Sequence, residues 1–329
     1  MGNRANLVIV ENQDWDLYYD HWAGCRILDS LIGGPELALR YIRSQRHCEK
    51  TEWTDPIWAD GGAVVDLDRR RLLFFGDELM VELPERRALM AVLEQLWPGY
   101  AICWAFDGTV ELAGYVGADL RPYAWDKQPP VELTRDRDAL CHLVSVKDIA
   151  GGVRLWPLHW ELSSAWRGPE LLDALPGRGV KSLTLNKIPE GGVHIDLAEQ
   201  MVGVWQTADT LGIFHELHDL WPGWHTECWE DRFEEQLKHC GAALRVPEVD
   251  LVAGIDSAQS WISKRVFQSF EDSPAGHIAQ LAGLLGPLHP GMTVSHDALA
   301  DCRTRPLPEE WTRFTAACDQ LRARRAKSA

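Results

Sequence analysis

Several features that are common in proteins are missing from this sequence of 329 residues. No apolar run approaches the roughly 18 residues that a membrane-spanning helix needs, and the first residues, MGNRANLVIV, lack the apolar stretch of a secretory signal. The 8 cysteines are scattered and form no dense disulfide framework. These absences predict a cytoplasmic protein with no membrane partner, whose thiols are reduced and mostly buried.

The sequence also lacks an excess of positive charge. It contains 33 Lys and Arg against 49 Asp and Glu, a net charge of −16. Affinity for phosphates comes from clustered basic side chains, so nucleic acid is not expected as a direct partner. An acidic surface attracts basic proteins through its long-range field, but it also serves solubility, and both interpretations stay open.

Common catalytic signatures are absent as well. There is no G-x-S-x-G, no G-x-x-x-x-G-K-[ST] and no G-x-G-x-x-G, the patterns of many hydrolases, phosphate-binding loops and dinucleotide-binding folds. The sequence therefore predicts no cofactor.

What the sequence does contain is an internal repeat. The heptad LxxLWPG occurs at 93–99 and again at 217–223. Other matching pairs accompany it: Leu7-Val8 with Leu143-Val144, His21-Trp22 with His159-Trp160, Gly34-Pro35-Glu36-Leu37 with Gly168-Pro169-Glu170-Leu171, Gly61-Gly62 with Gly191-Gly192, and Cys103-Trp104 with Cys228-Trp229. Features shared by both copies are expected to belong to the fold, and features of one copy to the function.

The order of apolar segments and turns predicts an α+β fold made of two tandem duplicated β-β-α-β-β-α-β-α lobes. In the first copy we expect strands at 6–10, 15–19, 62–68, 72–76 and 100–106, and helices at 35–46, from Pro84 to the heptad, and at 109–116. Proline cannot continue a helix, so each LWPG is interpreted as a helix end that precedes a strand, the second at 224–229.

The predicted domains follow from the repeat. The first α+β repeat covers 1–121, a proline-containing and charged linker covers 122–138, and the second, diverged repeat covers 139–247. A helical C-terminal extension covers 248–329, with helices at 257–271, 275–286 and 308–326.

Sixteen tryptophans make aromatic side chains an obvious candidate for function. Those at repeated positions, such as Trp97 and Trp221, are expected to pack in the core. Tryptophans without a counterpart are candidates for a contact surface: Trp53, Trp58, Trp125 and Trp166. The repeated pairs His21-Trp22 and His159-Trp160 form a second candidate binding set, with burial in the core as the alternative.

Acid–base catalysis needs two carboxylates with separated pKa values in one pocket. The candidates are Asp14, Asp16 and Asp20 with His21, and Asp66, Asp68, Asp77 and Glu78. Asp16 aligns with Arg154 and Asp68 with Ala198, so one copy at most could keep such a site. Ordinary solvated carboxylates are the alternative.

The nearest approach to a metal site is the set His225, Cys228, His239 and Cys240, because imidazole and thiolate are zinc donors. Adjacent residues such as His239 and Cys240 rarely reach one ion, and the first copy has Ala101 in place of His. The sequence therefore predicts no metal.

Taken together, these observations predict an acidic cytoplasmic protein-binding module, with a protein, possibly a basic one, as its partner. Bacterial immunity proteins that neutralise toxins have a composition of this character, which is an analogy and not a motif match. The alternative is a hydrolase or group-transfer enzyme with a carboxylate and histidine site in one repeat. Carboxylates that converge with His21 in a deep pocket would favour the enzyme, and exposed Trp on an acidic face would favour binding.

Overall fold

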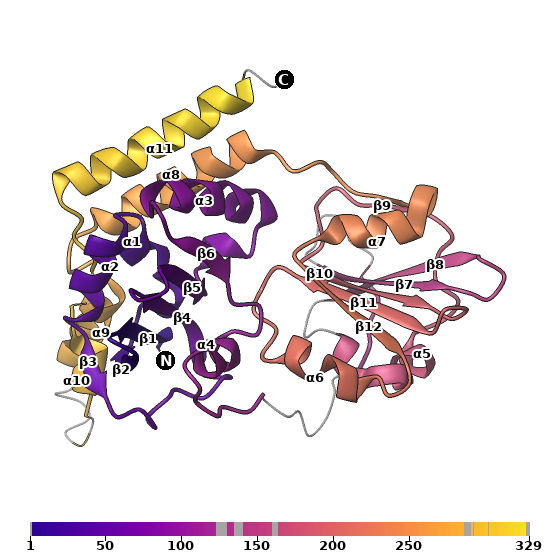
Figure 1. The fold of residues 1–329 in the computed structure, drawn as a ribbon, viewed down its shortest axis with the longest axis horizontal. Coiled ribbons are helices and arrows are strands. Elements are labelled where there is room, and N and C mark those ends of the chain that lie inside the picture. Colours follow the sequence, from indigo (N-terminus) through magenta and orange to yellow (C-terminus); the bar gives the residue numbers. More distant parts are fainter. Residues whose placement is uncertain are drawn as a thin grey trace. The chain divides into compact units, whose positions relative to one another are not determined.

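A computed structural model describes residues 2–122, 130–134, 141–159, 164–285, 291, 293–301 and 303–326. The chain forms two compact units. Unit 1 comprises Met1–Met80, Pro84–Leu120 and Asp250–Ala329, and unit 2 comprises Val81–Leu83 and Arg121–Val249. Each unit has its own mixed β-sheet with associated helices, which confirms the α+β class (Figure 1). Among the described residues, no helix combines the length and apolar character needed to cross a membrane.

The sheet of unit 1 has the order β3-β2-β1-β4-β5-β6. β1 pairs with β2 in antiparallel and with β4 in parallel orientation, and β5 pairs with β4 in antiparallel and with β6 in parallel orientation. The strands are β1 (Arg4–Glu11), β2 (Asp14–Asp20), β3 (Arg46–Cys48), β4 (Ala59–Asp66), β5 (Arg71–Phe75) and β6 (Ala101–Trp104).

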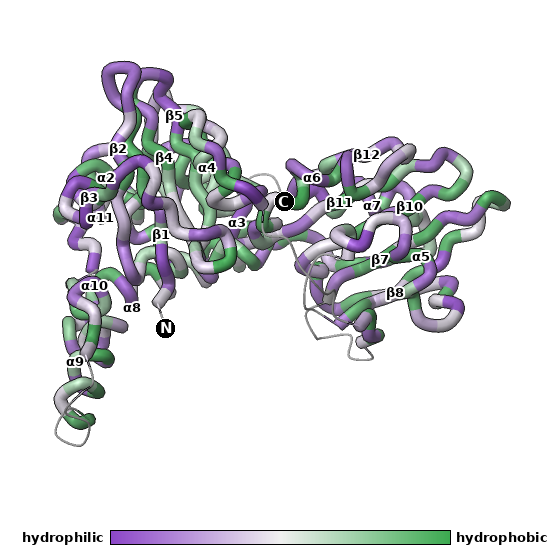
Figure 2. Tube along the Cα trace, turned by 90° about the horizontal axis from the view of Figure 1, so that it is seen from below, coloured by the Kyte–Doolittle hydropathy of each residue, from purple (hydrophilic) through white to green (hydrophobic). Residues whose placement is uncertain are grey.

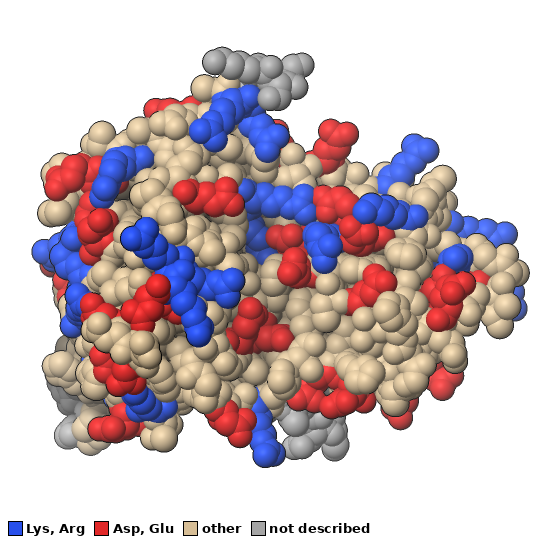
Figure 3. Space-filling view, in the orientation of Figure 1, with Lys and Arg blue, Asp and Glu red and all other residues tan. Residues whose placement is uncertain are grey.

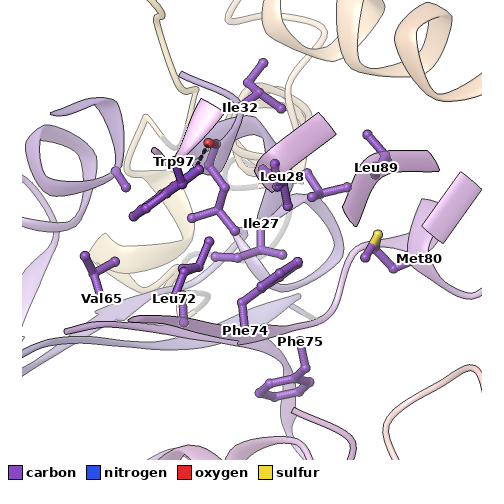
Figure 4. Close-up of a cluster of buried hydrophobic side chains, with 14 of the residues drawn as sticks. Ile27, Leu28, Ile32, Val65, Leu72, Phe74, Phe75, Met80, Leu89 and Trp97 are labelled. Atoms are coloured by element: carbon purple, nitrogen blue, oxygen red, sulfur yellow. Dashed lines mark hydrogen bonds between the residues drawn. The ribbon is translucent and has the colours of Figure 1, made fainter. Parts of the chain in front are cut away.

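The helices of unit 1 are α1 (Leu28–Leu31), α2 (Pro35–Ile42), α3 (Leu83–Leu96), α4 (Thr109–Tyr115), α8 (Leu251–Val266), α9 (Pro274–Leu285), α10 (His296–Leu299) and α11 (Pro308–Ala326). α2 and α4 contact the sheet directly, whereas α11 packs on α8 and α10 packs on α9. Figure 4 shows Leu72 and Phe74 of β5 on the side of Ile27 and Leu28, while Phe75 points the other way. The side chain of Leu112 in α4 lies on that second face, against Gly62.

One expected helix is shorter than its sequence pattern suggests. The helix predicted over 35–46 ends at Ile42, and Arg46–Cys48 form β3 instead. The cause is local, because Ser44 Oγ and Gln45 Nε2 both donate to the carbonyl of Tyr41, at 2.6 and 3.1 Å. Side chains therefore satisfy a carbonyl that another helical turn would have used.

The main sheet of unit 2 has the order β12-β11-β10-β7-β8, and its strand orientations match those of β6-β5-β4-β1-β2. The strands are β7 (Cys141–Lys147), β8 (Val153–His159), β10 (Gly191–Asp196), β11 (Met201–Gln206) and β12 (His225–Glu230), with a small pair of β9 (Leu183–Thr184) and β13 (Leu244–Arg245). Its helices are α5 (Leu171–Ala174), α6 (Ile213–Leu220) and α7 (Phe233–Cys240). Residues of the predicted linker lie along β8, where the His159 amide donates to the Glu132 carbonyl at 2.7 Å.

Both LWPG heptads end a helix, as predicted. α3 ends at Leu96 and α6 at Leu220, and the following Trp97 and Trp221 are fully buried. The indole of Trp97 donates to the Leu31 carbonyl at 2.9 Å (Figure 4), and that of Trp221 donates to the Ala165 carbonyl at 3.0 Å. In each unit, the repeated tryptophan thus connects the end of a core helix to a neighbouring segment through a hydrogen bond.

The repeated glycines explain how that segment approaches so closely. Gly34 has φ 82° and Gly168 has φ 59°, a region that favours glycine. A Cβ on Gly34 would lie 2.7 Å from the Leu96 carbonyl oxygen, and one on Gly168 would collide with the carbonyl oxygen of Leu220. Each glycine therefore lets the backbone rest against the end of the heptad helix.

The C-terminal residues are helical, as predicted, and they complete unit 1. α8 begins at Leu251, six residues before the expected start, because Asp250 caps it by accepting from the Val252 and Ala253 amides at 3.0 Å each. Farther along α8, Arg265 pairs with Asp29 and Asp77, each at 2.9 Å. Both carboxylates are buried, and Asp29 also pairs with Arg26 at 2.7 Å, so α8 supplies the counter-ion of Asp77 and a second one for Asp29.

Candidate functional site

The candidate carboxylates do not converge on one place. Asp14 and Asp20 stand at opposite ends of β2, which at about 3.3 Å per residue separates them by roughly 20 Å. Asp14, Asp66 and Asp68 line one pocket, and Asp20 and His21 line another. Asp77 belongs to the buried ion cluster with Arg265, while Asp16 and Glu78 are exposed.

The first pocket, which we call the turn pocket, has a volume of about 420 Å³. It lies where the β1–β2 and β4–β5 hairpins turn, at a hydrophilic end of the unit 1 sheet (Figure 2). Its walls include Gln13, Asp14, Trp15, Asp66, Asp68 and Tyr115.

Two of its carboxylates hold the turns in place. Asp68 accepts from the backbone amides of Asn12 and Gln13, at 3.0 and 2.7 Å. Asn12 and Gln13 have positive φ angles of 57° and 63°, which are unfavourable for residues other than glycine. Asp66 accepts from the Arg69 amide at 2.7 Å and from the Tyr115 hydroxyl at 2.6 Å. Both carboxylates therefore stabilise the turns that form the pocket, and they also give the pocket negative charge.

Basic side chains of the same chain lie close to the aromatic rings of the turn pocket. Lys50 forms an ion pair with Asp14, and its Nζ lies 4.9 Å from the centre of the Trp15 ring. The guanidinium groups of Arg69 and Arg71 lie 5.7 and 5.8 Å from the centre of Tyr115. Hydrogen bonding from Lys50 is the largest cause of a lowered pKa of Asp14. The pocket thus has the chemistry of a cation site, with carboxylates beside aromatic faces.

The second pocket, which we call the histidine pocket, has a volume of about 290 Å³. Its walls include Tyr19, His21, Trp22, Arg46, His296 and Asp297. His21 Nδ1 and the Tyr19 hydroxyl are 2.8 Å apart, and the Trp22 indole donates to the Ala298 carbonyl at 3.1 Å. The end of β2, the start of β3 and α10 meet here.

Asp20 lines this pocket, but both of its carboxylate oxygens already have hydrogen-bond partners within the fold. It is 4% exposed, and burial raises the pKa of its carboxyl group. One oxygen accepts from the Trp22 and Ala23 amides at 2.6 and 2.9 Å, and the other accepts from the Tyr41 hydroxyl at 2.6 Å. His21 and Asp20 are thus neighbours, as their sequence positions require, but their side chains have different partners.

The tryptophans expected at a contact surface differ in their exposure to solvent. Trp58 is 60% exposed, whereas Trp53 and Trp166 are half-buried and pack against the cores of units 1 and 2. Trp125 and Trp160 lie outside the described residues. His159 is exposed at the end of β8, and Trp22 is buried.

Two further exposed aromatics, Trp261 and Phe267, were not among the candidates, and they are 52% and 64% exposed. Trp261 lies on α8, and Phe267 directly follows its last residue. The helical pattern of α8 shows that some side chains must be exposed, but not which ones. Together with Leu281 and Leu284 of α9, they place much of the exposed apolar area on the C-terminal helices, and α9 projects from the rest of unit 1 (Figure 2).

The four metal-ligand candidates belong to two elements, β12 and α7, and they do not converge on one place. His225 and Cys228 are exposed, His239 is half-buried and Cys240 is buried. His225 Nε2 is 3.2 Å from Glu227 Oε1, and the His239 ring stacks on Trp229 at 5.4 Å between centres. Within the described part of the chain, no group of three or more His, Cys, Asp or Glu could hold a metal ion.

Sequence reasoning missed two buried histidines in unit 2. Burial lowers the pKa of His142 to about 4 and that of His194 to about 3. His194 Nδ1 is 2.8 Å from Ser145 Oγ, whereas neither ring nitrogen of His142 has a hydrogen-bond partner. Both rings are neutral at pH 7. In the sequence alignment of the two copies they stand where unit 1 has Asn6 and Val64, so they are features of one unit only.

Charged side chains of both signs are interspersed on the face of the molecule in Figure 3, so that face presents no broad patch of one sign. A scan against models of protein families, a search of curated proteins and a search of solved structures found no match to this chain. The two pockets are therefore the structural features on which a function can be based.

Proposed function

We propose that the chain is a protein-binding module that receives basic side chains of a partner protein in the turn pocket. The observation that carries the proposal is the arrangement of Asp14, Asp66 and Asp68 around a cavity walled by Trp15 and Tyr115. Carboxylates and aromatic faces both attract guanidinium and ammonium groups. The net charge of −16 adds a long-range attraction for a basic protein.

The geometry of the pocket suits recognition better than acid–base catalysis. Asp66 and Asp68 are held by backbone and tyrosine donors, and Asp14 already has Lys50 as a counter-ion. His21 lies at the far end of β2, so it cannot exchange protons with these carboxylates. An enzyme of the hydrolase or group-transfer class would have to use the histidine pocket instead, where the buried carboxylate of Asp20 is occupied.

The partner would replace contacts that the chain makes with itself. Asp14 has 76% of its side chain exposed and Lys50 has 46%, so the ion pair between them is open to water. An ion pair between exposed side chains contributes little to stability, so an incoming arginine can displace Lys50 at little cost. Arginine would also stack on Trp15, which lysine does less well.

We further infer that the two units arose by tandem duplication and that unit 1 took on the binding role. Support comes from the matching strand orders and from the paired contacts of Trp97 and Trp221. Unit 2 has Ala198 where unit 1 has Asp68 in the sequence alignment, so its turn lacks one of the three carboxylates of the turn pocket. An immunity-type role, neutralising a basic bacterial toxin, is the form of this function that the composition favours.

The first experiment measures binding of an arginine-rich peptide and of a glutamate-rich peptide of equal length. We expect the arginine-rich peptide alone to bind, with affinity that falls as salt rises. Asp14→Asn should weaken binding by about three- to tenfold. Asp16→Asn is the matched control, because Asp16 is on the same strand, is 60% exposed and pairs with His47 outside the pocket.

The second experiment compares proteins retained from a bacterial host lysate by the wild type, Asp14→Asn and Asp16→Asn. The proposal expects one basic protein in stoichiometric amount with the wild type and Asp16→Asn, and less of it with Asp14→Asn. Equal retention by all three variants, or no basic protein with any of them, would contradict the proposal.

A further inference from the structure

We propose that the histidine pocket is a second binding site, which takes a small organic anion through its carboxylate or phosphate group. This inference is independent of the turn pocket, because the ligand has the opposite charge and the walls share no residue. The sites have opposite chemistry although both belong to unit 1.

Arg46 is the principal anion-binding group of this site. Its guanidinium lies 4.6 Å from the centre of the Tyr19 ring, and its Nε is 3.3 Å from Asp297 Oδ2. These two contacts fix the plane of the guanidinium. Among the described residues, none accepts a hydrogen bond from its two Nη nitrogens. An oriented pair of donors of this kind matches the two oxygens of a carboxylate or phosphate.

The negative groups around the pocket are mostly engaged elsewhere. Both oxygens of Asp20 accept hydrogen bonds from Trp22, Ala23 and Tyr41. The Tyr41 carbonyl at the end of α2 accepts from Ser44 and Gln45, so it is not left facing an incoming anion. Asp297 alone keeps a partly exposed carboxylate, 31% of its side chain, and it orients Arg46.

Two histidines and two large aromatic rings complete the walls. His21 is fixed by the Tyr19 hydroxyl and by edge contact with Trp22, at 4.8 Å between ring centres. His296 comes from α10 and presents an imidazole that can donate to an anion. Trp22 and Tyr19 offer apolar surface to the organic part of the ligand. A volume of about 290 Å³ is at the lower end for ligand pockets and suits a compact molecule.

The site is a feature of unit 1 only. The wall made by His296 and Asp297 belongs to α10, which lies in the C-terminal part of the chain after the repeated segments. The described part of unit 2 has no helix in the corresponding place. The pocket therefore combines residues of β2 and β3 with residues of α10.

The test is isothermal titration calorimetry at pH 7 with three probes: inorganic phosphate, glycerol 2-phosphate and malonate. We expect at least one probe to bind the wild type with a Kd of about 1 mM or lower. The phosphate and malonate arms distinguish a phosphate ligand from a carboxylate ligand. Arg46→Gln should weaken binding by at least about tenfold, and Arg46→Lys should also weaken it because the fork of donors is lost.

Arg43→Gln is the matched control. Arg43 precedes Arg46 by three residues, has a similar side-chain exposure of 50% against 47%, and pairs with Glu11 outside the pocket. Its substitution should leave binding unchanged, and circular dichroism should confirm that every variant is folded. The inference is overturned if no probe binds the wild type at about 10 mM, or if Arg43→Gln and both Arg46 variants weaken binding equally.

Discussion

Acid should destabilise unit 2 through His142, a buried imidazole without hydrogen-bond partners. Burial lowers the pKa of His142 from 6.5 to about 4. The unfolded chain therefore binds a proton more readily than the folded chain does between these two values. Stability is unaffected by this group at pH 7, and it falls as the pH drops through 6.5 towards 4.

The size of the effect follows from the shift. One pKa unit corresponds to about 1.4 kcal/mol, so the cost of His142 reaches roughly 3 kcal/mol at pH 4. His142→Phe keeps a planar ring in this position and removes the titrating group. The free energy of unfolding of the variant, relative to that of the wild type, should therefore rise by about 3 kcal/mol when the pH is lowered from 7 to 4. Any change in packing is present at both pH values and cancels in this difference.

Hydrogen–deuterium exchange of β10, Gly191–Asp196, is the appropriate measurement because this central strand pairs directly with β7, which carries His142. The ratio of the exchange rate in the wild type to that in the variant should be roughly a hundredfold larger at pH 4 than at pH 7. His218→Phe, on an exposed part of α6, is the control and should show no such change. The reasoning is refuted if the ratio between His142→Phe and the wild type is the same at both pH values.

Three further predictions concern other parts of the fold. Burial raises the pKa of Glu190 to about 7, so the stability that this group contributes is present below pH 4.5 and is lost as the pH rises through 7. Glu190→Gln should therefore stabilise unit 2 by roughly 3 kcal/mol at pH 8 and leave it unchanged at pH 4, measured by urea unfolding. Gln13→Gly should raise the stability of unit 1 by about 1 kcal/mol in thermal unfolding, because glycine adopts the positive φ of 63° without strain. A lower Tm of the variant would contradict this explanation of the turn. Trp97→Phe and Trp221→Phe should each cost about 1–3 kcal/mol, because each removes an indole hydrogen bond to a backbone carbonyl and part of a fully buried ring. A difference of more than about 2 kcal/mol between the two variants in urea unfolding would show that the two tryptophans are not equivalent.

Local features of the fold could be predicted from the sequence because the signals are themselves local. Proline and glycine after Leu96 and Leu220 end the helices whatever surrounds them. The alternating segments around Asp66 predicted the β4–β5 hairpin for the same reason. In contrast, the three residues of β3 are too few to carry a pattern, and β3 exists because it pairs with β2.

The composition of the two pockets could not be predicted, because it depends on which strands are neighbours. Asp68 reaches the amides of Asn12 and Gln13 only because β1 and β4 lie side by side in parallel, an arrangement that brings the two hairpin turns together. His296 meets His21 across 275 positions of the sequence. The acidic candidates Asp14, Asp66 and Asp68 were identified from residue type, but their separation from His21 required the strand order.

The pairing of Arg265 with Asp77 has a consequence for synthesis of the chain. Asp29 has Arg26 as a counter-ion three residues earlier, whereas Asp77 leaves the ribosome long before the guanidinium of Arg265, with most of unit 2 translated in between. We therefore expect the packing around Asp77 to be completed only after α8 has been synthesised, because a buried carboxylate without a counter-ion is strongly unfavourable.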